Sequence, residues 1–303
     1  MSRIAIAIVN WNSIHHTLNC LSSLEHLETS HEVQIFVLDN GSLEQEHQVI
    51  QDQFPEVRTF RVEENLGFTG GNNFLLQIIR EGTFDFFLLL NNDTFVSENF
   101  LDRLVETACQ EKKTIVQPLI GWAHDRKATW NAGGKLNRWT GQSITVGYDQ
   151  PITWFASKKA YPIDWFTGCC ILCSTDILTE IPFFRNNYFA YNEDVETSLR
   201  LKESGVTIVL EPRAVIYHVA GGSGRKKSKE NEGSILPILH YYNIRNRFWT
   251  LRLHRDQYVW TAFVFQLLKT IAYLIYFVLR GRWKKMKMAF RAIQDGWYQN
   301  LAL

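Results

Sequence analysis

Residues 84–94 read FDFFLLLNNDT, an apolar run that ends abruptly in two asparagines and an aspartate. A continuous apolar run of this length is typical of a parallel strand that is buried on both faces of a sheet. Burying an unpaired carboxylate costs much more free energy than exposing it, so we expect Asp93 at the tip of the strand, in a crevice. The stretch therefore predicts the central strand of a sheet with a polar edge.

Strands and helices alternate around this stretch. Apolar runs of strand type also occur at 4–9, 33–38 and 57–62, and helical patterns lie near 14–27, 43–53, 70–81 and 97–110. Such alternation predicts an α/β fold, in which helices cover both faces of a parallel sheet.

The second half of the chain is less regular. Residues 121–165 are rich in Trp, Gly and polar residues, which indicates hairpins and a long loop. Further strands are expected at 169–174, 206–210 and 214–218, and helices at 189–205, 234–252, 256–280 and 283–298.

Polar, glycine-rich segments follow four of the predicted strands. They are NWN (10–12), DNGS (39–42), ENLGFTGGNN (64–73) and NNDT (91–94). Turn formation explains any one of them. Open α/β sheets bind ligands at the carboxyl ends of their strands, however, and four such segments on one side of a sheet favour a ligand crevice. The spacing of Gly67, Gly70 and Gly71 matches neither a dinucleotide-binding fingerprint nor a P-loop, so those two enzyme classes are not indicated.

Residues 189–205 read FAYNEDVETSLRLKESG and place three acids at the start of a helical pattern. Acids in a first turn complement the helix dipole, so the stretch taken alone predicts a capped helix. The five cysteines are odd in number, and three crowd into CCILC (169–173), which indicates buried thiols in a reducing cytosol.

The ordered set of these segments resembles glycosyltransferase family 2, in its bacterial rhamnosyltransferase-like branch. The segments that carry the resemblance are VNWN (9–12), LDNGS (38–42), NLGFTGGNN (65–73), LLLNNDT (88–94), WFTGCCIL (165–172), FAYNEDVETSLRLKESG (189–205) and HVAGGS (218–223). The resemblance covers about residues 3–250. It implies a type A glycosyltransferase fold, which is Rossmann-like with a mostly parallel central sheet, and an inverting, metal-dependent reaction on a nucleotide-diphosphate sugar.

The resemblance also implies roles for individual residues. Asp194 matches the general base, and Asp93 with His218 matches the site for Mg²⁺ or Mn²⁺; the first Asp of the family's D-x-D is Asn91 here. The nucleotide-sugar would lie against Asn10, Asp39, Asn65, Gly71, Asn72, Asn91 and Asp93. The acceptor would lie against Trp165, Thr167, Gly168 and Glu193. Basic residues of the segment 219–233, namely Arg225, Lys226, Lys227 and Lys229, either close over the diphosphate or form a solvated charge run.

The C-terminal part is basic and apolar together. Residues 1–224 carry 17 Lys and Arg against 27 Asp and Glu, whereas residues 225–303 carry 15 against 4. The apolar run at 258–279 is interrupted by Lys269, whose charge at the centre of a bilayer would be costly. We therefore expect 234–303 to be a helical extension that lies on a membrane surface, behind a catalytic domain at 1–233. A true membrane span and a homodimer interface are the alternatives, and nucleic acid is not expected as a partner.

These observations predict a peripheral enzyme on the cytoplasmic face of a bacterial inner membrane. The resemblance implies that it transfers L-rhamnose from dTDP-rhamnose to a polyprenyl-linked precursor of a cell-surface polysaccharide such as O-antigen. Two other hypotheses remain. The protein could transfer another hexose from a UDP-sugar, or it could be an inert membrane-bound partner of such an enzyme.

Overall fold

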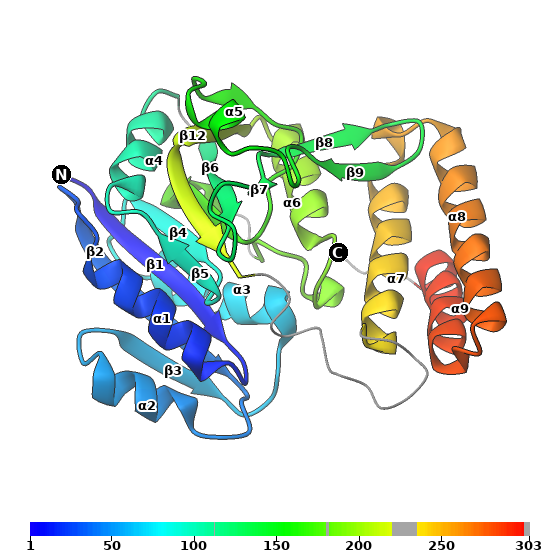
Figure 1. Cartoon of the computed structure of the whole chain (residues 1–303), viewed down its shortest axis with the longest axis horizontal. Coiled ribbons are helices and arrows are strands. Elements are labelled where there is room, and N and C mark those ends of the chain that lie inside the picture. The colour runs from blue at the N-terminus through cyan, green and yellow to red at the C-terminus, as the bar shows by residue number, and fades with distance from the viewer. Residues whose placement is uncertain (112, 180–181, 220–234, 300–303) are drawn as a thin grey trace.

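A mixed sheet forms the centre of the protein, with helices on both of its faces (Figure 1). The computed structural model describes residues 1–111, 113–179, 182–219 and 235–299. Within these residues, ten strands join one sheet, whose main path runs β10-β12-β6-β11-β4-β1-β2-β3, while β5 pairs with β12 and β7 with β6. The strands of this sheet are β1 (Arg3–Asn10), β2 (Glu32–Asn40), β3 (Arg58–Val62), β4 (Phe86–Leu90), β5 (Thr94–Val96), β6 (Thr114–Trp122), β7 (Thr129–Asn131), β10 (Tyr161–Pro162), β11 (Cys170–Ser174) and β12 (Thr207–His218).

The parallel part of the sheet matches the prediction. Strand β1 is parallel to β2 and β4, β2 is parallel to β3, and β6 is parallel to β12. The helices that alternate with these strands are α1 (Ile14–Glu25), α2 (Glu46–Gln53), α3 (Gly67–Arg80) and α4 (Phe100–Ala108). Strand β11 runs antiparallel between β4 and β6 and joins the two parallel groups. The α/β fold with a mostly parallel central sheet is therefore confirmed.

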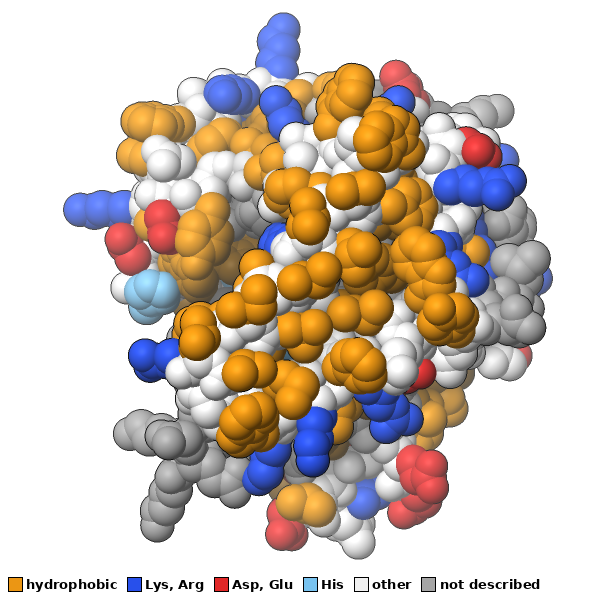
Figure 2. Space-filling model, turned by 90° about the vertical axis from the view of Figure 1, so that its right-hand side faces the viewer, with side chains coloured by type: hydrophobic (Ala, Val, Ile, Leu, Met, Phe, Trp, Pro, Cys, Tyr) orange, Lys and Arg blue, Asp and Glu red, His pale blue; other side chains and the backbone are white. Residues whose placement is uncertain are grey.

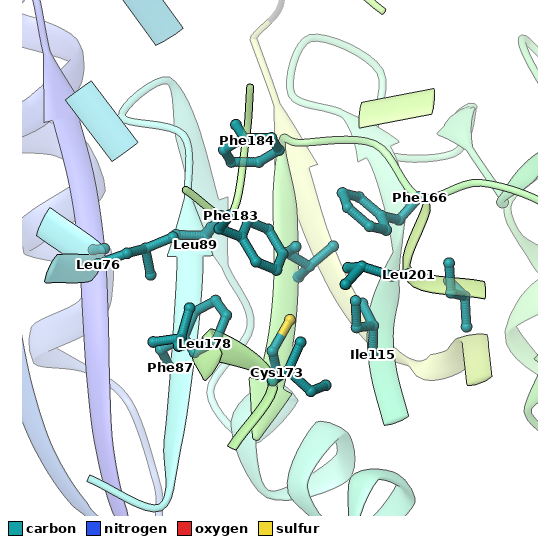
Figure 3. Packing of buried hydrophobic residues seen from close by; sticks show 14 of the residues in the cluster. Leu76, Phe87, Leu89, Ile115, Phe166, Cys173, Leu178, Phe183, Phe184 and Leu201 are labelled. Carbon is teal, nitrogen blue, oxygen red and sulfur yellow. The ribbon is translucent and has the colours of Figure 1, made fainter. Parts of the chain in front are cut away.

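Strand β4 is buried on both faces, as its apolar run predicts. Phe87 and Leu89 belong to the core on one side of the sheet, and Leu88 and Leu90 to the core on the other. Alternate residues of a strand point to opposite faces, which is why a strand with two buried faces needs an unbroken apolar run. Figure 3 shows the first of these cores, where aromatic side chains such as Phe183 pack over the sheet.

Two details of the sheet differ from the sequence prediction. The expected strands 206–210 and 214–218 are one strand, β12, whose register shifts between Glu211 and Val215. Strand β6 was not predicted from the sequence, and it contains Pro118, a residue that is unusual in a central strand. The gap between the two expected strands contains Pro212 of β12, and the register shift against β6 spans this residue, directly after the pair Glu211–Pro118. Proline has no N–H to donate, and irregularities of this kind are where a sheet tolerates it.

A hairpin and five helices complete the described fold. The hairpin is β8 (Gly134–Asn137) and β9 (Gln142–Thr145), and the short helix α5 (Thr153–Ala156) follows it. Helix α6 (Glu193–Glu203) leads into β12, and α7 (Pro237–Leu253), α8 (Trp260–Leu279) and α9 (Trp283–Tyr298) form a bundle at the end of the molecule (Figure 1). The bundle joins the rest of the protein through a small apolar cluster in which Val195 and Leu199 of α6 meet Leu251 and Ala262.

Helix α8 presents an exposed apolar face. It is the one helix in the described part of the chain that is long and apolar enough to cross a membrane, and only 22% of the residues in its apolar window are buried. Figure 2 shows hydrophobic side chains as a nearly continuous band over this end of the molecule, with Lys and Arg near the band. The polar residues Gln266 and Thr270 face the protein and are buried. The exposed face of α8 is therefore mainly apolar, whereas its buried face combines Gln266 and Thr270 with Ala262 and Phe277.

Candidate active site

A crevice of about 700 Å³ opens at the carboxyl ends of the central strands. Its walls come from segments far apart in the sequence, including β4, β7, the β8–β9 hairpin, β12, the start of α6 and α7. The sequence-predicted residues that line it are Asn65, Asn72, Asn91, Asp93, Trp165, Thr167, Gly168, Glu193, Asp194 and His218. Ten of the predicted site residues thus share one cavity, as expected for the polar edge of an α/β sheet.

Asp93 and His218 meet on one wall of the crevice. Strand β5 starts directly after Asp93 and pairs antiparallel with the end of β12, with Thr94 opposite His218. The Val219 N–H donates to the Asp93 carbonyl at 2.9 Å, so main-chain bonds hold the two side chains together across 125 residues of sequence. His218 Nε2 lies 2.9 Å from Asp93 Oδ1. Burial alone would raise the pKa of Asp93. The hydrogen bond and the charge of His218 have the opposite and larger combined effect, so the pKa of Asp93 lies below its usual value.

This pair fits a divalent cation in its chemistry. A carboxylate oxygen and an imidazole nitrogen are both suitable ligands for Mn²⁺. His218 Nδ1 is buried and has no hydrogen-bond partner among the described residues. Hydrogen bonds within the protein therefore do not use both nitrogens of the ring. The described residues contain no group of three or more His, Cys, Asp or Glu side chains that could hold a metal. Mg²⁺ and Mn²⁺ sites often have few protein ligands, and substrate phosphates and waters complete them.

Three predicted donor-side residues lie beneath the crevice rather than on its surface. Asn10 is fully buried and donates from Nδ2 to Glu46 Oε2 at 2.7 Å. Asp39 is also fully buried, and its Oδ2 accepts from Arg61 Nη1 at 2.8 Å. A Cβ on Gly71 would lie 3.0 Å from the side chain of Val9, which explains a glycine where α3 approaches the sheet. In this structure these residues shape the floor, and both carboxylate oxygens of Asp39 are bonded within the protein, Oδ1 by the Ser42 N–H and Oδ2 by Arg61.

Glu193 and Asp194 start α6 on the opposite wall. Asp194 Oδ1 accepts from the Val195 N–H at 2.8 Å. Burial raises the pKa of Asp194 to about 6, against the lowering effect of main-chain hydrogen bonds that include one from Gly168. Burial, with the charge of Asp194, raises the pKa of Glu193 well above its usual value, and Glu193 Oε2 has no hydrogen-bond partner among the described residues. The two acids therefore differ from simple helix caps, since both resist ionisation.

The loop before α6 has a strained backbone. Phe189, Tyr191 and Asn192 have φ values of 63°, 71° and 62°. Left-handed conformations of non-glycine residues cost about 1–3 kcal/mol each and persist only where the surroundings enforce them. The loop therefore needs external support to present Asp194 to the crevice.

Helix α7 supplies that support through Asn246 and Arg245. The amide of Asn246, which is fully buried, lies 2.9, 2.8 and 2.7 Å from the carbonyls of Tyr188, Ala190 and Tyr191. Arg245 Nη2 donates to the carbonyl of Asn187 at 2.8 Å. Sequence reasoning missed both residues. The available signal was the spacing of Asn243, Asn246 and Thr250, which places three polar residues on one face of an otherwise aromatic helix.

Two further side chains position the segment Trp165–Gly168. Gln117 Oε1 of β6 accepts from the Thr167 N–H at 2.8 Å, and Ser198 Oγ of α6 accepts from the Phe166 N–H at 3.1 Å. Trp165 Nε1 donates to the Lys135 carbonyl in the β8–β9 hairpin at 3.1 Å. The segment is thus fixed between the sheet, α6 and the hairpin, on the same wall as Asp194.

Residues 2–234 match the family described as "Glycosyltransferase like family 2". The chain belongs to this family. A curated relative is the N-acetylglucosaminyl-diphospho-decaprenol L-rhamnosyltransferase of Mycobacterium tuberculosis, which is 25% identical over 241 residues, or 73% of this chain and 77% of the relative. The protein is therefore a glycosyltransferase, similar to a rhamnosyltransferase at low identity.

Solved structures agree with the fold of the family. The structure of GalNAc-T7 with UDP, GalNAc and Mn²⁺ has a TM-score of 0.63 at 14% identity and matches 83% of this chain. Staphylococcus aureus TarS (residues 1–349) in complex with UDP has a TM-score of 0.51 at 15% identity and matches 82% of this chain. This chain spans about half (48%) of the length of the GalNAc-T7 chain and 65% of the length of the TarS chain. The type A glycosyltransferase fold expected from the sequence is confirmed.

The basic residues Arg225, Lys226, Lys227 and Lys229 lie outside the described residues, as does the predicted domain boundary at 233/234. Their proposed closure over a diphosphate and the division into 1–233 and 234–303 stay predictions.

Proposed function

We propose that this glycosyltransferase transfers L-rhamnose from dTDP-rhamnose to a polyprenyl-linked glycan, with inversion at the anomeric carbon. The observation that carries the proposal is that one crevice holds an acid suited to act as a base, Asp194, and a separate pair suited to a diphosphate-bound cation, Asp93 and His218. The rhamnosyl donor and the lipid-linked acceptor are taken from the relative with 25% identity.

In the proposed reaction Asp194 takes the proton of the acceptor hydroxyl. As that proton leaves, the hydroxyl oxygen forms a bond to the anomeric carbon, and the bond from this carbon to the diphosphate oxygen breaks on the opposite face. A carboxylate with a pKa of about 6 is a stronger base than an ordinary aspartate, yet it remains largely ionised at neutral pH. The residues Trp165, Thr167, Gly168 and Glu193, which line the crevice near Asp194, would contact the acceptor sugar.

Asp93 and His218 would hold Mg²⁺ or Mn²⁺, with the remaining ligands from the donor diphosphate and water. The bound cation would supply stabilisation of the negative charge that develops on the leaving nucleotide diphosphate. Asn65, Asn72 and Asn91 would contact the nucleotide-sugar from the crevice wall, and Asn10, Asp39 and Gly71 would support them from the floor.

We also propose that α8 lies in the surface of a membrane, which would place the enzyme peripherally on the cytoplasmic face of the inner membrane. The large side chains of α8 that are exposed are Trp260, Val264, Phe265, Leu267, Leu268, Ile271, Tyr273, Ile275, Tyr276, Val278 and Leu279. Basic residues follow at Arg280, Arg282, Lys284, Lys287 and Arg291. An apolar face beside basic residues is typical of in-plane helices on anionic lipids, where each Lys or Arg contributes about 1 kcal/mol.

The membrane proposal is tested by flotation of the full chain with liposomes. Binding to vesicles that contain phosphatidylglycerol should exceed binding to purely zwitterionic vesicles, and Leu268→Glu with Ile275→Glu should abolish it. The matched control is Val49→Glu with Leu43→Glu, since these exposed apolar residues lie far from α8 in the fold. Unchanged binding of the α8 variant contradicts the proposal, and a dimer of the soluble protein that dissociates in that variant favours a homodimer interface instead.

The donor is tested by saturation-transfer NMR and donor hydrolysis with a panel of dTDP- and UDP-sugars, with and without Mn²⁺. We expect dTDP-rhamnose to bind best and Mn²⁺ to strengthen binding. Preference for a UDP-hexose would replace rhamnose by another sugar. Equal inertness toward every donor would contradict the assignment of an active enzyme.

A further inference from the structure

Asn131 lines the crevice but has no role in the reaction described above. It ends β7, and only 2% of its surface is exposed. Its side-chain oxygen accepts from two donors, the Gly133 N–H at 2.7 Å and Gln117 Nε2 at 2.9 Å. Its side-chain nitrogen, Nδ2, has no partner among the described residues. This nitrogen is not enclosed as the hydroxyl of Thr129 is, so it opens on the crevice.

The orientation of both amides follows from main-chain groups at either end. The Thr167 N–H, which can only donate, bonds Gln117 at 2.8 Å, so the bonded atom is Oε1 and the other end of Gln117 is a donor. The Gly133 N–H closes an Asx turn on Asn131 and likewise requires the oxygen there. Gly133 has a φ of 97°, and a Cβ on it would lie 2.4 Å from Ile163, so only glycine fits this turn. Nδ2 is therefore a donor with a fixed direction.

Other amides of the crevice are used within the protein. Asn40 Nδ2 donates to the Gly67 carbonyl at 3.1 Å, and Asn72 Nδ2 to the Phe68 carbonyl at 2.8 Å. These amides hold the walls together. The nitrogen of Asn131 is instead available to a ligand atom that accepts a hydrogen bond, such as the oxygen of a sugar hydroxyl.

On one side, Asn131 lies close to the pair Asp93 and His218. The residue before it is Trp130, whose ring contacts that of His218 with 4.4 Å between the centroids. Strand β7 pairs with β6, which also pairs with the end of β12 at His218. One residue thus separates Asn131 from a direct contact with the proposed cation site.

On the other side, Asn131 is linked to Asp194. A single amide, that of Gln117, joins Asn131 to the Thr167 N–H. The next residue, Gly168, donates its N–H to Asp194. Asn131 therefore lies between the two walls of the crevice.

The transferred sugar has to lie between the same two walls. In the proposed reaction its anomeric carbon is bonded to the diphosphate, which the cation at Asp93 and His218 would hold. The same carbon is attacked by the hydroxyl that Asp194 deprotonates. The ring hydroxyls of the sugar therefore approach residues that lie between these groups, as Asn131 does.

We propose that Asn131 Nδ2 donates a hydrogen bond to a ring hydroxyl of the transferred sugar, and that Gln117 orients it for this contact. The inference rests on the proposed function. A donor of fixed direction selects sugars that carry an oxygen at that place, because a sugar without this hydroxyl leaves the donor without a partner. Asn131 thus helps to determine which sugar the enzyme accepts.

The test measures binding rather than transfer. Isothermal titration calorimetry with Mg²⁺ present compares dTDP, dTDP-rhamnose and analogues of dTDP-rhamnose that each lack one ring hydroxyl. In the wild type we expect one analogue to bind at least about tenfold more weakly than dTDP-rhamnose, because it leaves Nδ2 without a partner. In Asn131→Ser this difference should vanish, whereas the affinity for dTDP, which lacks the sugar, should stay within about twofold.

Serine is chosen because its oxygen can still accept from the Gly133 N–H, whereas its side chain is shorter than that of asparagine. Asn137→Ser is the matched control. Asn137 Oδ1 also accepts main-chain N–H groups of a turn, those of Trp139 and Thr140, but Asn137 lies in the hairpin and does not line the crevice. This variant should keep the full difference between dTDP-rhamnose and the weak analogue.

Gln117→Met is the second variant, since it keeps Asn131 and removes the donor that orients it. It should reduce the difference by at least about threefold. The inference is overturned if the wild type binds every analogue as tightly as dTDP-rhamnose, or if the weak binding of one analogue persists in Asn131→Ser. It is also overturned if Asn131→Ser loses as much affinity for dTDP as for dTDP-rhamnose, since that result indicates a purely structural role.

The same titrations with UDP, UDP-glucose and its analogues that lack one hydroxyl separate this inference from the proposed function. If only the UDP-glucose series binds, and one analogue binds weakly to the wild type but not to Asn131→Ser, the inference holds and rhamnose is the wrong sugar. If dTDP-rhamnose is bound and transferred but no analogue depends on Asn131, the rhamnosyl function holds and the inference is wrong. Absence of binding in both series contradicts both.

Discussion

The two walls of the crevice place their acidic residues by different means. On the wall of Asp93 and His218, a main-chain ladder between β5 and β12 fixes both residues. On the wall of Glu193 and Asp194, a loop with a strained backbone is held by side chains of another helix, above all Asn246. Main-chain bonds are indifferent to most substitutions, whereas a support made of side chains depends on every one of them.

We therefore expect substitutions elsewhere in the protein to disturb the geometry of the two walls to different extents. The first wall would keep its geometry in nearly any sequence that forms the sheet. The second is linked through α7 to α8 and α9, so its geometry depends on the C-terminal bundle. The following predictions test whether the wall of Asp194 is both the chemically active one and the one more sensitive to distant changes.

The largest effect is expected for Asp194→Asn. Removal of a general base typically lowers the rate by 10²–10⁴-fold, so kcat should fall by about 10³. Donor affinity, measured by saturation-transfer NMR with Mn²⁺ present, should stay within about twofold of the wild type. Loss of the metal or the nucleotide in this variant would show that the base has been assigned to the wrong wall.

A smaller but clear effect is expected for Asn246→Ala. The two N–H groups of the Asn246 amide serve three carbonyls, of which that of Tyr188 also accepts from Arg245 Nη2. At about 1–3 kcal/mol for each of the two acceptors left without a donor, the free energy of unfolding should fall by about 3 kcal/mol in urea denaturation. Misplacement of a reacting group by about 1 Å costs up to about 100-fold in rate, so kcat should fall by a similar factor.

The matched control on the other wall is Thr94→Val. It removes the hydrogen bond from Thr94 Oγ1 to the Asn91 carbonyl at 2.7 Å but leaves the main-chain ladder intact. We expect kcat to change by less than about threefold, since a single neutral hydrogen bond contributes about 1 kcal/mol. An equal loss of kcat in both variants would contradict the difference between the walls.

The pH dependence of the rate should report Asp194. Because its pKa is about 6, kcat/KM should fall as the pH drops through about 6, by about tenfold for each further pH unit as the carboxylate becomes protonated. Transfer assays from pH 4.5 to 8 at saturating Mn²⁺ would measure this. The residual activity of Asp194→Asn should lack the acidic limb, and a limb that remains there belongs to another group.

The smallest effect concerns the pH dependence of stability. His254 after α7 lies 3.4 Å from Glu196 and 3.0 Å from Glu203 of α6. Burial lowers the pKa of His254, but the hydrogen bonds and charges of the two glutamates raise it more, so the folded-state pKa exceeds the usual 6.5. The stability from this contact is fully present below pH 6.5 and is lost as the pH rises through the folded-state pKa.

The free energy of unfolding should therefore decrease more steeply above pH 6.5 in the wild type than in His254→Gln, as measured by urea denaturation between pH 6 and 9. Parallel curves for the two proteins would mean that this contact does not hold α6 against α7.

The sequence predicted the elements whose pattern is local. The apolar run at 84–90 and the alternating runs before it led to β1–β4, because burial of both faces leaves a direct mark on the sequence. The strand ends also led to Asp93 and His218, and the resemblance to the family led to Asp194; all three line one crevice. Their assigned roles came from the ordered resemblance to the family and stay predictions.

What the sequence missed depends on partners distant along the chain. In the sequence, Asp39 looks like an accessible acid at the end of a strand. In the structure, Arg61 lies directly opposite it in the ladder between β2 and β3 and donates a hydrogen bond to its carboxylate. Strand β6 was not predicted, and its Pro118 pairs with Glu211 directly before the register shift of the neighbouring strand β12. Asn246 reads as one more helical residue until the loop at 188–191 is seen against it. Of these contacts, only that of Asn246 has a local sequence signal, which is the spacing of polar residues along α7.

The β8–β9 hairpin bears on how far an acceptor can extend. Its tip is bonded to α8, through Gln266 Nε2 to the Thr140 carbonyl at 2.7 Å and Thr261 Oγ1 to the Trp139 carbonyl at 2.8 Å. Its other end reaches the crevice at Thr145. Strands of four residues span about 13 Å. If α8 rests on a bilayer, the hairpin acts as a spacer of fixed height, and the enzyme would select acceptors by length, favouring the first sugars of a growing chain over its distant end.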